Sequence, residues 1–177
     1  MIGIYNRLPL TRNFFIVPGI MRSFIAMMDL VPIQPLLEDN PDFLHHPDCQ
    51  ESLLMVIEYY KKIGWHFPWI CYFARLDNQL VGSAGSKGPP VNNRIEIAYG
   101  TFPALRRRGV GAEICRTLVN LSLKTDPRIT ITARTLPERN FSARILEKNN
   151  FRLLGNVWDE EDGDVWEWEY QQQPVNF

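Results

Sequence analysis

The stretch RIEIAYGTFPALRRRGVGAEICRTLV, residues 94–119, decides the fold of this chain, because its structural period changes partway along. The first half alternates apolar and polar side chains, with Ile95 and Ile97 on one face, which is typical of a strand over residues 94–102. The second half spaces its apolar residues three and four apart, which predicts an amphipathic helix. The predicted buried stripe of that helix is Val110, Ile114, Leu118 and Leu121.

The loop between this strand and this helix, residues 106–111, combines three arginines with two glycines. Glycines permit a tight turn and let a ligand approach the backbone. The first amides of the helix and the positive end of its dipole favour an anion, and Arg106 would add charge-assisted hydrogen bonds. The spacing is neither that of a Walker loop nor that of a dinucleotide fingerprint. The loop is therefore either a phosphate or pyrophosphate site or a solvated basic turn.

Composition narrows the class of protein. Of the 177 residues, 45% are hydrophobic and 22% are charged, which fits one globular domain over residues 1–177. The net charge of −1 attracts neither nucleic acid nor an anionic membrane, and no apolar run is long enough to span a bilayer. We find no signal peptide, and the cysteines and histidines lack metal-ligand spacing, so we expect reduced thiols, a cytoplasmic location and no metal.

Further elements follow on both sides of the opening stretch. The predicted helices cover residues 48–63 and 140–148, and the predicted strands cover residues 69–76, 79–88, 128–136, 151–158 and 164–170. Asp77-Asn78 is a turn dipeptide that joins two of these strands as a hairpin. Nearer the start, residues 13–18 allow a strand, residues 19–30 have helical spacing without a cap, and prolines then punctuate a long connection.

The order of the well-marked elements is helix, three strands, helix, strand, helix, two strands. A run of antiparallel strands followed by a β-α-β-α unit predicts an α/β (α+β) fold. The sheet should be mixed and mostly antiparallel, with helices on its flanks.

The chain resembles the GNAT superfamily of acyl-CoA-dependent N-acetyltransferases over roughly residues 80–170, and most closely its RimJ/RimL-like branch. The resemblance rests on the motifs LVGSAGSKGPP, IEIAYGTFPALRRRGVGAE, ARTLPERNFSARILEKNNF and GDVWEWE. It implies the GNAT fold, with an acetyl-CoA-binding core in residues 66–170 and an acceptor side in residues 1–65.

The resemblance also implies where acetyl-CoA, the co-substrate, would bind. In the family the arginine-glycine loop holds the pyrophosphate, and the pantetheine arm lies like an added strand against the end of the fourth strand. Arg106 fills the motif position, and Gly100 leaves room for the thioester. The implied acetyl-CoA-binding residues are Tyr99, Gly100, Thr101, Phe102, Arg106, Arg107, Arg108, Gly109, Val110, Gly111, Ala112 and Asn140.

Two residues are candidates for the chemistry. Glu96 is the carboxylate of the strand and could act as the base, directly or through water; the alternative is an exposed glutamate paired with Arg94. Ser142 would lie near the sulfur as a hydrogen-bond donor, as the RimJ/RimL-like resemblance implies. Ser142 and Asn140 could instead be helix caps. Many relatives have a tyrosine where this chain has Leu146, so that general acid is absent.

These features predict an N-acetyltransferase that moves an acetyl group from acetyl-CoA to a primary amine by direct attack in a ternary complex. The amine could belong to a protein N-terminus or to a small molecule. A coenzyme A-binding module without chemistry is the alternative. We expect a monomer or homodimer that binds acetyl-CoA and an amine acceptor.

Overall fold

The structure is a computed structural model, and it describes residues 28–172. A seven-stranded sheet with the order β1-β2-β3-β4-β5-β7-β6 is the framework of these residues. The strands are β1 (Met28–Pro32), β2 (Cys71–Leu76), β3 (Gln79–Ser86), β4 (Arg94–Thr101), β5 (Thr130–Thr135), β6 (Phe151–Asp159) and β7 (Gly163–Tyr170). Strands β4 and β5 are parallel, and every other neighbouring pair is antiparallel. The prediction of a mixed, mostly antiparallel sheet flanked by helices is confirmed.

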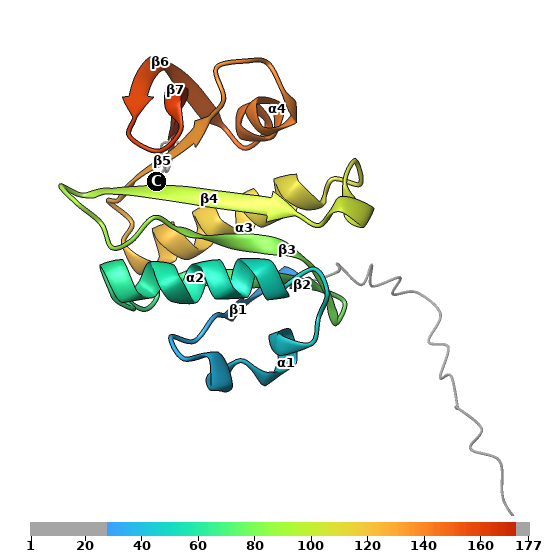
Figure 1. Cartoon of the computed structure of the whole chain (residues 1–177). Coiled ribbons are helices and arrows are strands. Elements are labelled where there is room, and N and C mark those ends of the chain that lie inside the picture. The colour runs from blue at the N-terminus through green and yellow to red at the C-terminus, as the bar shows by residue number, and fades with distance from the viewer. Residues whose placement is uncertain (1–27, 173–177) are drawn as a thin grey trace, which may run out of the picture.

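Helices cover both faces of this sheet (Figure 1). They are α1 (Pro41–Leu44), α2 (Gln50–Ile63), α3 (Val110–Thr125) and α4 (Phe141–Lys148), with short 3-10 turns η1 (Leu37–Asp39) and η2 (Pro103–Leu105). Helix α2 lies on the near face in Figure 1, and α3 lies behind β3 and β4. Helix α4 contacts α3 and β6. None of the helices in residues 28–172 has both the length and the apolar character needed to cross a membrane.

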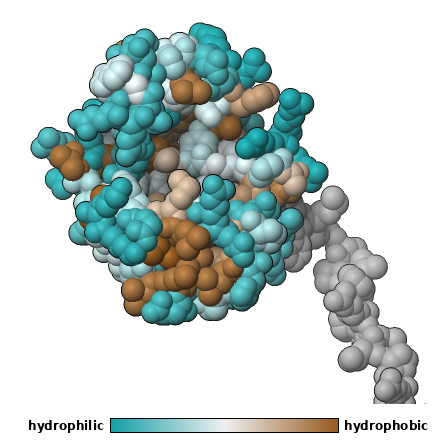
Figure 2. Space-filling view, in the orientation of Figure 1, coloured by the Kyte–Doolittle hydropathy of each residue, from teal (hydrophilic) through white to brown (hydrophobic). Residues whose placement is uncertain are grey.

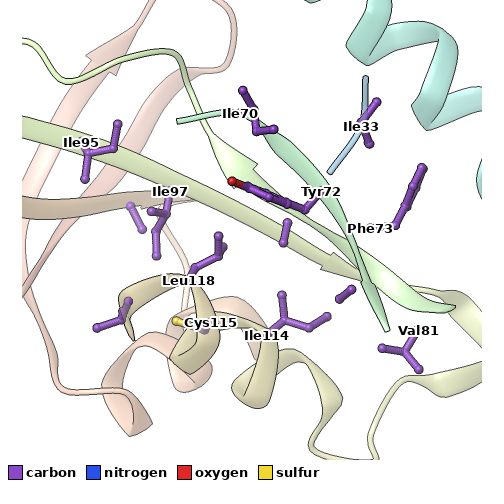
Figure 3. Packing of buried hydrophobic residues seen from close by; sticks show 14 of the residues in the cluster. Ile33, Ile70, Tyr72, Phe73, Val81, Ile95, Ile97, Ile114, Cys115 and Leu118 are labelled. Atoms are coloured by element: carbon purple, nitrogen blue, oxygen red, sulfur yellow. The ribbon is translucent and has the colours of Figure 1, made fainter. Parts of the chain in front are cut away.

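The core between the sheet and α3 is built from the alternation that the sequence displays. Ile95 and Ile97 of β4 are each 2% exposed, and Figure 3 shows them with Leu118 and Cys115 of α3. Three residues of the predicted helical stripe are buried, but Leu121 is only partly buried. Gly111, Cys115, Val119 and Ser122 are buried as well. The buried face is therefore wider than the predicted one.

Local signals fix the ends of several elements. Asp77 and Asn78 have φ values of 49° and 65°, which is the left-handed geometry of a two-residue hairpin turn, so the β2–β3 hairpin is confirmed. Gly64, with φ 83°, ends α2 as expected. Each prediction rested on a residue type that tolerates positive φ.

The N-terminal region differs from its prediction. The helix indicated by the spacing of residues 19–30 is wrong for Met28–Leu30. These residues belong to β1 and pair with β2 through backbone hydrogen bonds. Pairing with an existing strand outweighs a weak local period. Residues 13–18 and the rest of the proposed helix lie outside the described residues.

Strands β4 and β5 separate partway along, and this separation positions the site. Their parallel pairing covers only the steps from Arg94 to Glu96, although β4 continues to Thr101 and β5 to Thr135; β5 pairs with β7 along its other edge. Lys87 N–H donates to Glu96 O and Phe102 N–H donates to Val81 O, so the even-numbered residues of β4 hydrogen-bond toward β3. By the same alternation, the backbone groups of Tyr99 and Thr101 point into the gap beside β4.

Candidate active site

The arginine-glycine loop presents a row of unpaired backbone amides. Arg107 and Gly109 both have left-handed φ values, 63° and 80°, which turn successive peptide groups the same way. Among the described residues, the N–H groups from Arg107 through Gly111 donate to no acceptor of the chain. The loop enters α3 directly, and Gly109 is its N-cap residue. Such a row at the positive end of a helix is suited to a phosphate group.

The two glycines of the loop are needed for different reasons. A side chain on Gly109 would meet open space, so glycine is favoured there by the positive φ alone. A Cβ on Gly111 would lie 2.9 Å from Ile145 Cδ1 and 3.0 Å from Thr101 Oγ1. Gly111 therefore lets α3 approach both α4 and the end of β4.

A first cavity of about 640 Å³ opens over this loop. It is lined by Tyr99, Gly100, Thr101, Leu105, Arg106, Arg107, Gly109, Val110, Gly111, Ala112, Phe141, Ser142, Arg144, Ile145 and Lys148. Of these lining residues, Arg106, Arg107, Arg144 and Lys148 are cationic and none is acidic. A cavity with free amides and several cations fits the diphosphate of acetyl-CoA, and the unpaired edge of β4 fits its amide-bearing arm.

The contribution of α4 to this cavity was not predicted from the sequence. Arg144 and Lys148 are four residues apart and so lie on one face of α4, which is the signal that could have identified them. Phe141, at the start of α4, lies 5.6 Å from the guanidinium carbon of Arg107 in a cation–π contact. This contact joins the loop to α4 across the cavity.

Three residues implied as acetyl-CoA ligands lie outside the cavity lining. Phe102 is 7% exposed and packs against Phe73, with the ring centroids 6.4 Å apart. Arg108 is exposed beside the cavity. Asn140 is the N-cap of α4, and its side-chain oxygen accepts the Ala143 N–H at 3.1 Å. Capping accounts for Asn140, whereas Ser142 does line the cavity.

A second cavity of about 310 Å³ lies between α2 and the sheet. It is lined by Ile33, Ser52, Met55, Val56, Tyr59, Cys71, Tyr72, Phe73, Ser83, Ala84, Gly85, Ser86, Lys87, Ala98, Tyr99 and Gly100. The two cavities share Tyr99 and Gly100, at the level where β4 has left β5. The Ser83 hydroxyl oxygen would lie 3.2 Å from a Cβ on Gly100, so a larger residue there would narrow the junction.

Glu96 lines neither cavity but belongs to an ion-pair network beside the second one. Its carboxylate lies 3.1 Å from Lys87 Nζ and 3.5 Å from Arg134 Nε, and its side chain is 18% exposed. Arg94, the partner suggested by the sequence, pairs with Glu169 at 3.2 Å instead. Glu96 is thus a half-buried carboxylate with two cationic partners.

Asp159 extends this network. It accepts hydrogen bonds from the N–H groups of Glu161 and Asp162 and from Arg134, and these lower the pKa of its carboxyl to about 2. Burial by itself would lower the pKa of Lys87. The carboxylates of Glu96 and Asp159 outweigh this effect, so the pKa of the lysine is raised. The pKa shifts of Lys87 and Asp159 therefore both favour their charged forms.

Two other groups near the junction stay protonated. Burial raises the pKa of Cys115 to about 12, and burial also raises the pKa of Tyr99, which packs beside it. A thiol with so high a pKa is a poor nucleophile. Leu146, at the position where many relatives have a tyrosine, is 1% exposed.

The fold is shared with solved acetyltransferase structures. The aminoglycoside acetyltransferase AAC(6')-Ib in complex with coenzyme A aligns with a TM-score of 0.61 and 19% identity, covering 84% of this chain and 95% of that one. The RimL alpha-N-protein acetyltransferase, also with coenzyme A, aligns with a TM-score of 0.56 and 14% identity, covering 80% and 92%. At these identities the likeness establishes the fold alone.

Sequence comparison places the chain in a family. The uncharacterized N-acetyltransferase YjdG of Bacillus subtilis (strain 168) is 36% identical over 87 residues, or 48% of this chain and 51% of that protein. The match thus spans about half the length of that curated relative. The sequence model of the family described as "Acetyltransferase (GNAT) domain" matches residues 33–152, which is more than half of the chain. With the fold and this match in agreement, the chain belongs to the GNAT acetyltransferase family.

Proposed function

We propose that this protein transfers the acetyl group of acetyl-CoA to a primary amine by direct attack within a ternary complex. The observation behind the proposal is that two cavities of different character meet at Tyr99 and Gly100. One is cationic and bordered by free amides, and the other is enclosed by α2 and mostly apolar. A thioester entering from the first would face an amine entering from the second.

The chain supplies binding and polarisation for this reaction. The loop amides and Arg106 would hold the diphosphate, and the free N–H groups of Tyr99 and Thr101 are available to the pantetheine arm and the thioester oxygen. When bound, acetyl-CoA supplies an activated acyl group and a thiolate leaving group. Ser142, at the opposite wall of the first cavity, is our candidate donor to that thiolate.

The amine must lose its proton before or during the attack. Glu96 remains our candidate base, acting through water: it lines neither cavity and its carboxylate pairs with Lys87, so it would take up the proton at the Lys87 end of the acceptor cavity before the amine moves to Gly100. Direct attack needs no covalent enzyme intermediate, and the high pKa of Cys115 agrees with that.

The experiment follows release of free thiol from acetyl-CoA in the presence of primary amines. The Gly100→Ala variant adds a methyl group at the junction, 3.2 Å from Ser83 Oγ. We expect it to lower kcat/KM for the amine while the affinity for acetyl-CoA, measured by calorimetry, stays within about threefold. Wild-type protein that binds acetyl-CoA but acetylates no amine would refute the enzyme.

That outcome would favour the second candidate, a coenzyme A-binding module. The buried Leu146 supports this alternative, since the position provides no hydroxyl to a leaving thiolate. The module predicts full acetyl-CoA affinity and no thiol release with any amine.

The acceptor and the branch of the family belong to the same proposal. An aminoglycoside acetyltransferase and an alpha-N-protein acetyltransferase share the fold, so both small-molecule and protein acceptors occur among proteins with this fold. We propose the RimJ/RimL-like branch on the motif around Asn140 and Ser142, with residues 28–65 forming one wall of the acceptor site. Free cysteines throughout the chain agree with a cytoplasmic enzyme.

A further inference from the structure

We infer that the acceptor is a hydrophobic monoamine, with one ammonium group on an apolar body, and not a polycation such as a polyamine. This inference rests on the proposed acetyl transfer and concerns its acceptor cavity. It follows from the described residues that line the second cavity, none of which is a carboxylate, and from the ion pairs of the one charged residue among them.

The walls of the acceptor cavity are mostly apolar. Helix α2 contributes Met55, Val56 and Tyr59, and the sheet contributes Phe73 and Ala98. Ser52 and Ser83 add hydroxyl groups but no charge. Such walls stabilise an alkyl or aromatic body by removing it from water, at roughly 25 cal/mol per Å² of buried apolar area.

No carboxylate lines this cavity among the described residues, and the remaining residues cannot supply one from a side chain. All 20 aspartates and glutamates of the sequence fall within residues 28–172, because residues 1–27 and 173–177 contain none. A second or third ammonium group would therefore enter the cavity without an acidic partner. An unpaired charge in an apolar site is strongly disfavoured.

The charge that does line the cavity has the wrong sign for a polycation. Of the described lining residues, Lys87 alone is charged. Its partners Glu96 and Asp159 lie 3.1 and 3.8 Å from its ammonium, and both also contact Arg134. These carboxylates are thus already paired with cations of the chain and are not free to bind those of a ligand.

The geometry sets the length of the apolar body. Lys87 lies opposite Glu96 on the sheet, and Gly100 is four residues farther along β4. At about 3.3 Å per residue, the floor from the junction to Lys87 is about 13 Å long. A chain of several carbons whose amine reaches Gly100 would lie over this floor and stop short of Lys87.

The surface at the mouth agrees with an apolar ligand. Met55 lines the cavity and is 66% exposed, so the apolar wall reaches the surface there. Figure 2 shows apolar surface gathered on the part of the molecule where α2 and the preceding segment lie. The apolar lining therefore continues outward at the entrance.

The test compares two amines that differ by one ammonium group, n-hexylamine and hexamethylenediamine. Thiol release is measured with saturating acetyl-CoA at fixed pH and ionic strength, and binding of each amine to the enzyme–coenzyme A complex is measured by calorimetry. We expect at least a tenfold higher kcat/KM and a tighter Kd for hexylamine, although the diamine offers two reactive ends. Equal or better use of the diamine would overturn the inference.

A variant at the mouth provides the matched control. Met55→Glu adds one carboxylate on an exposed helical position and should reduce the preference for hexylamine severalfold, whereas Met55→Gln should leave it unchanged. An identical preference in both variants, or acetylation of peptides but of neither alkylamine, would contradict the assigned cavity. Absence of thiol release with every amine, despite acetyl-CoA binding, would refute the acetyltransferase itself and this inference with it.

Discussion

Replacing Gly109 by alanine tests the loop by changing only its backbone energetics. Gly109 is the N-cap of α3, with φ 80° and ψ −4°, and a methyl group there would contact nothing within 4 Å. Any effect of Gly109→Ala must therefore come from the cost of a left-handed backbone for a residue with a Cβ. A substitution at Gly109 therefore measures backbone strain without a change in side-chain packing.

The expected magnitude follows from that geometry. An L-residue in the left-handed region costs roughly 1–2 kcal/mol relative to its right-handed form. For a chain of this size, each 1 kcal/mol lowers Tm by about 2–4 °C. The variant loop could also relax out of the left-handed region in the free protein. Acetyl-CoA would then bind only after the loop returns to the left-handed conformation, and this return costs binding free energy. Because the strain bounds that penalty, the loss of acetyl-CoA affinity should lie within roughly 5- to 30-fold.

The assay is urea unfolding followed by tryptophan fluorescence, with acetyl-CoA affinity measured by calorimetry on the same samples. Gly109→Asn is the matched control, since asparagine tolerates the left-handed region better than alanine does. We expect the order wild type, asparagine, alanine in the sum of the two losses, because the strain lowers stability if the free protein keeps the turn and lowers affinity if it does not.

Two results would refute the reasoning. If alanine is as well tolerated as glycine in both measurements, the loop does not have the left-handed turn. If the losses in unfolding free energy and in binding free energy together clearly exceed about 2 kcal/mol, the substitution disturbs more than the backbone of one left-handed residue.

Further predictions concern the junction and the ion-pair network. Ser142→Ala should lower kcat by about 10²-fold with little change in acetyl-CoA Kd, while Ser142→Thr should retain most activity; equal kcat in all three would leave Ser142 without a catalytic role. Glu96→Gln should lower kcat at neutral pH with unchanged acetyl-CoA affinity, and a normal pH–rate profile would exclude it as the base. Gly111→Asp places a carboxylate within the amide row and should abolish acetyl-CoA binding, whereas wild-type affinity would contradict the site. The pKa of Asp159 falls from 3.8 to about 2 on folding, so its contribution to stability is present above about pH 4 and is lost as the pH falls toward 2. In acid unfolding, Asp159→Asn should therefore reduce the fall in stability between about pH 4 and pH 2.

Local sequence signals predicted most of the fold because they act over short distances. The alternation of β4, the period of α3 and the turn at Asp77-Asn78 each reflect contacts within a few residues, and each was confirmed. Strand β1 was missed because its stability comes from pairing with β2, residues far away in the sequence. Leu121 was placed in the buried stripe because periodicity gives the direction of the apolar face but not how far the neighbouring elements cover it.

The loop and the end of β4 could be recognised as a candidate site because glycine and arginine at fixed spacing have a direct physical meaning. The spacing of Arg144 and Lys148 puts them on one face of α4, but the sequence does not show that α4 lies beside the loop. Only the tertiary structure places these two cations in the first cavity. The ion pairs of Glu96 were misjudged for the same reason: Lys87 follows the end of β3 and Arg134 lies in β5, so neither belongs to the strand of Glu96.

By itself, the sequence determined the strand-loop-helix unit, the glycines that its turn requires and the family to which the chain belongs. Only the tertiary structure decided that β4 parts from β5, that two cavities meet at Tyr99 and Gly100, and that none of the residues 28–172 that line the second cavity is a carboxylate. The physical reason is distance along the chain. Secondary-structure propensity and hydrophobic period depend on residues that are neighbours in the sequence. A cavity forms where several elements meet, and no short stretch of sequence specifies how those elements are placed.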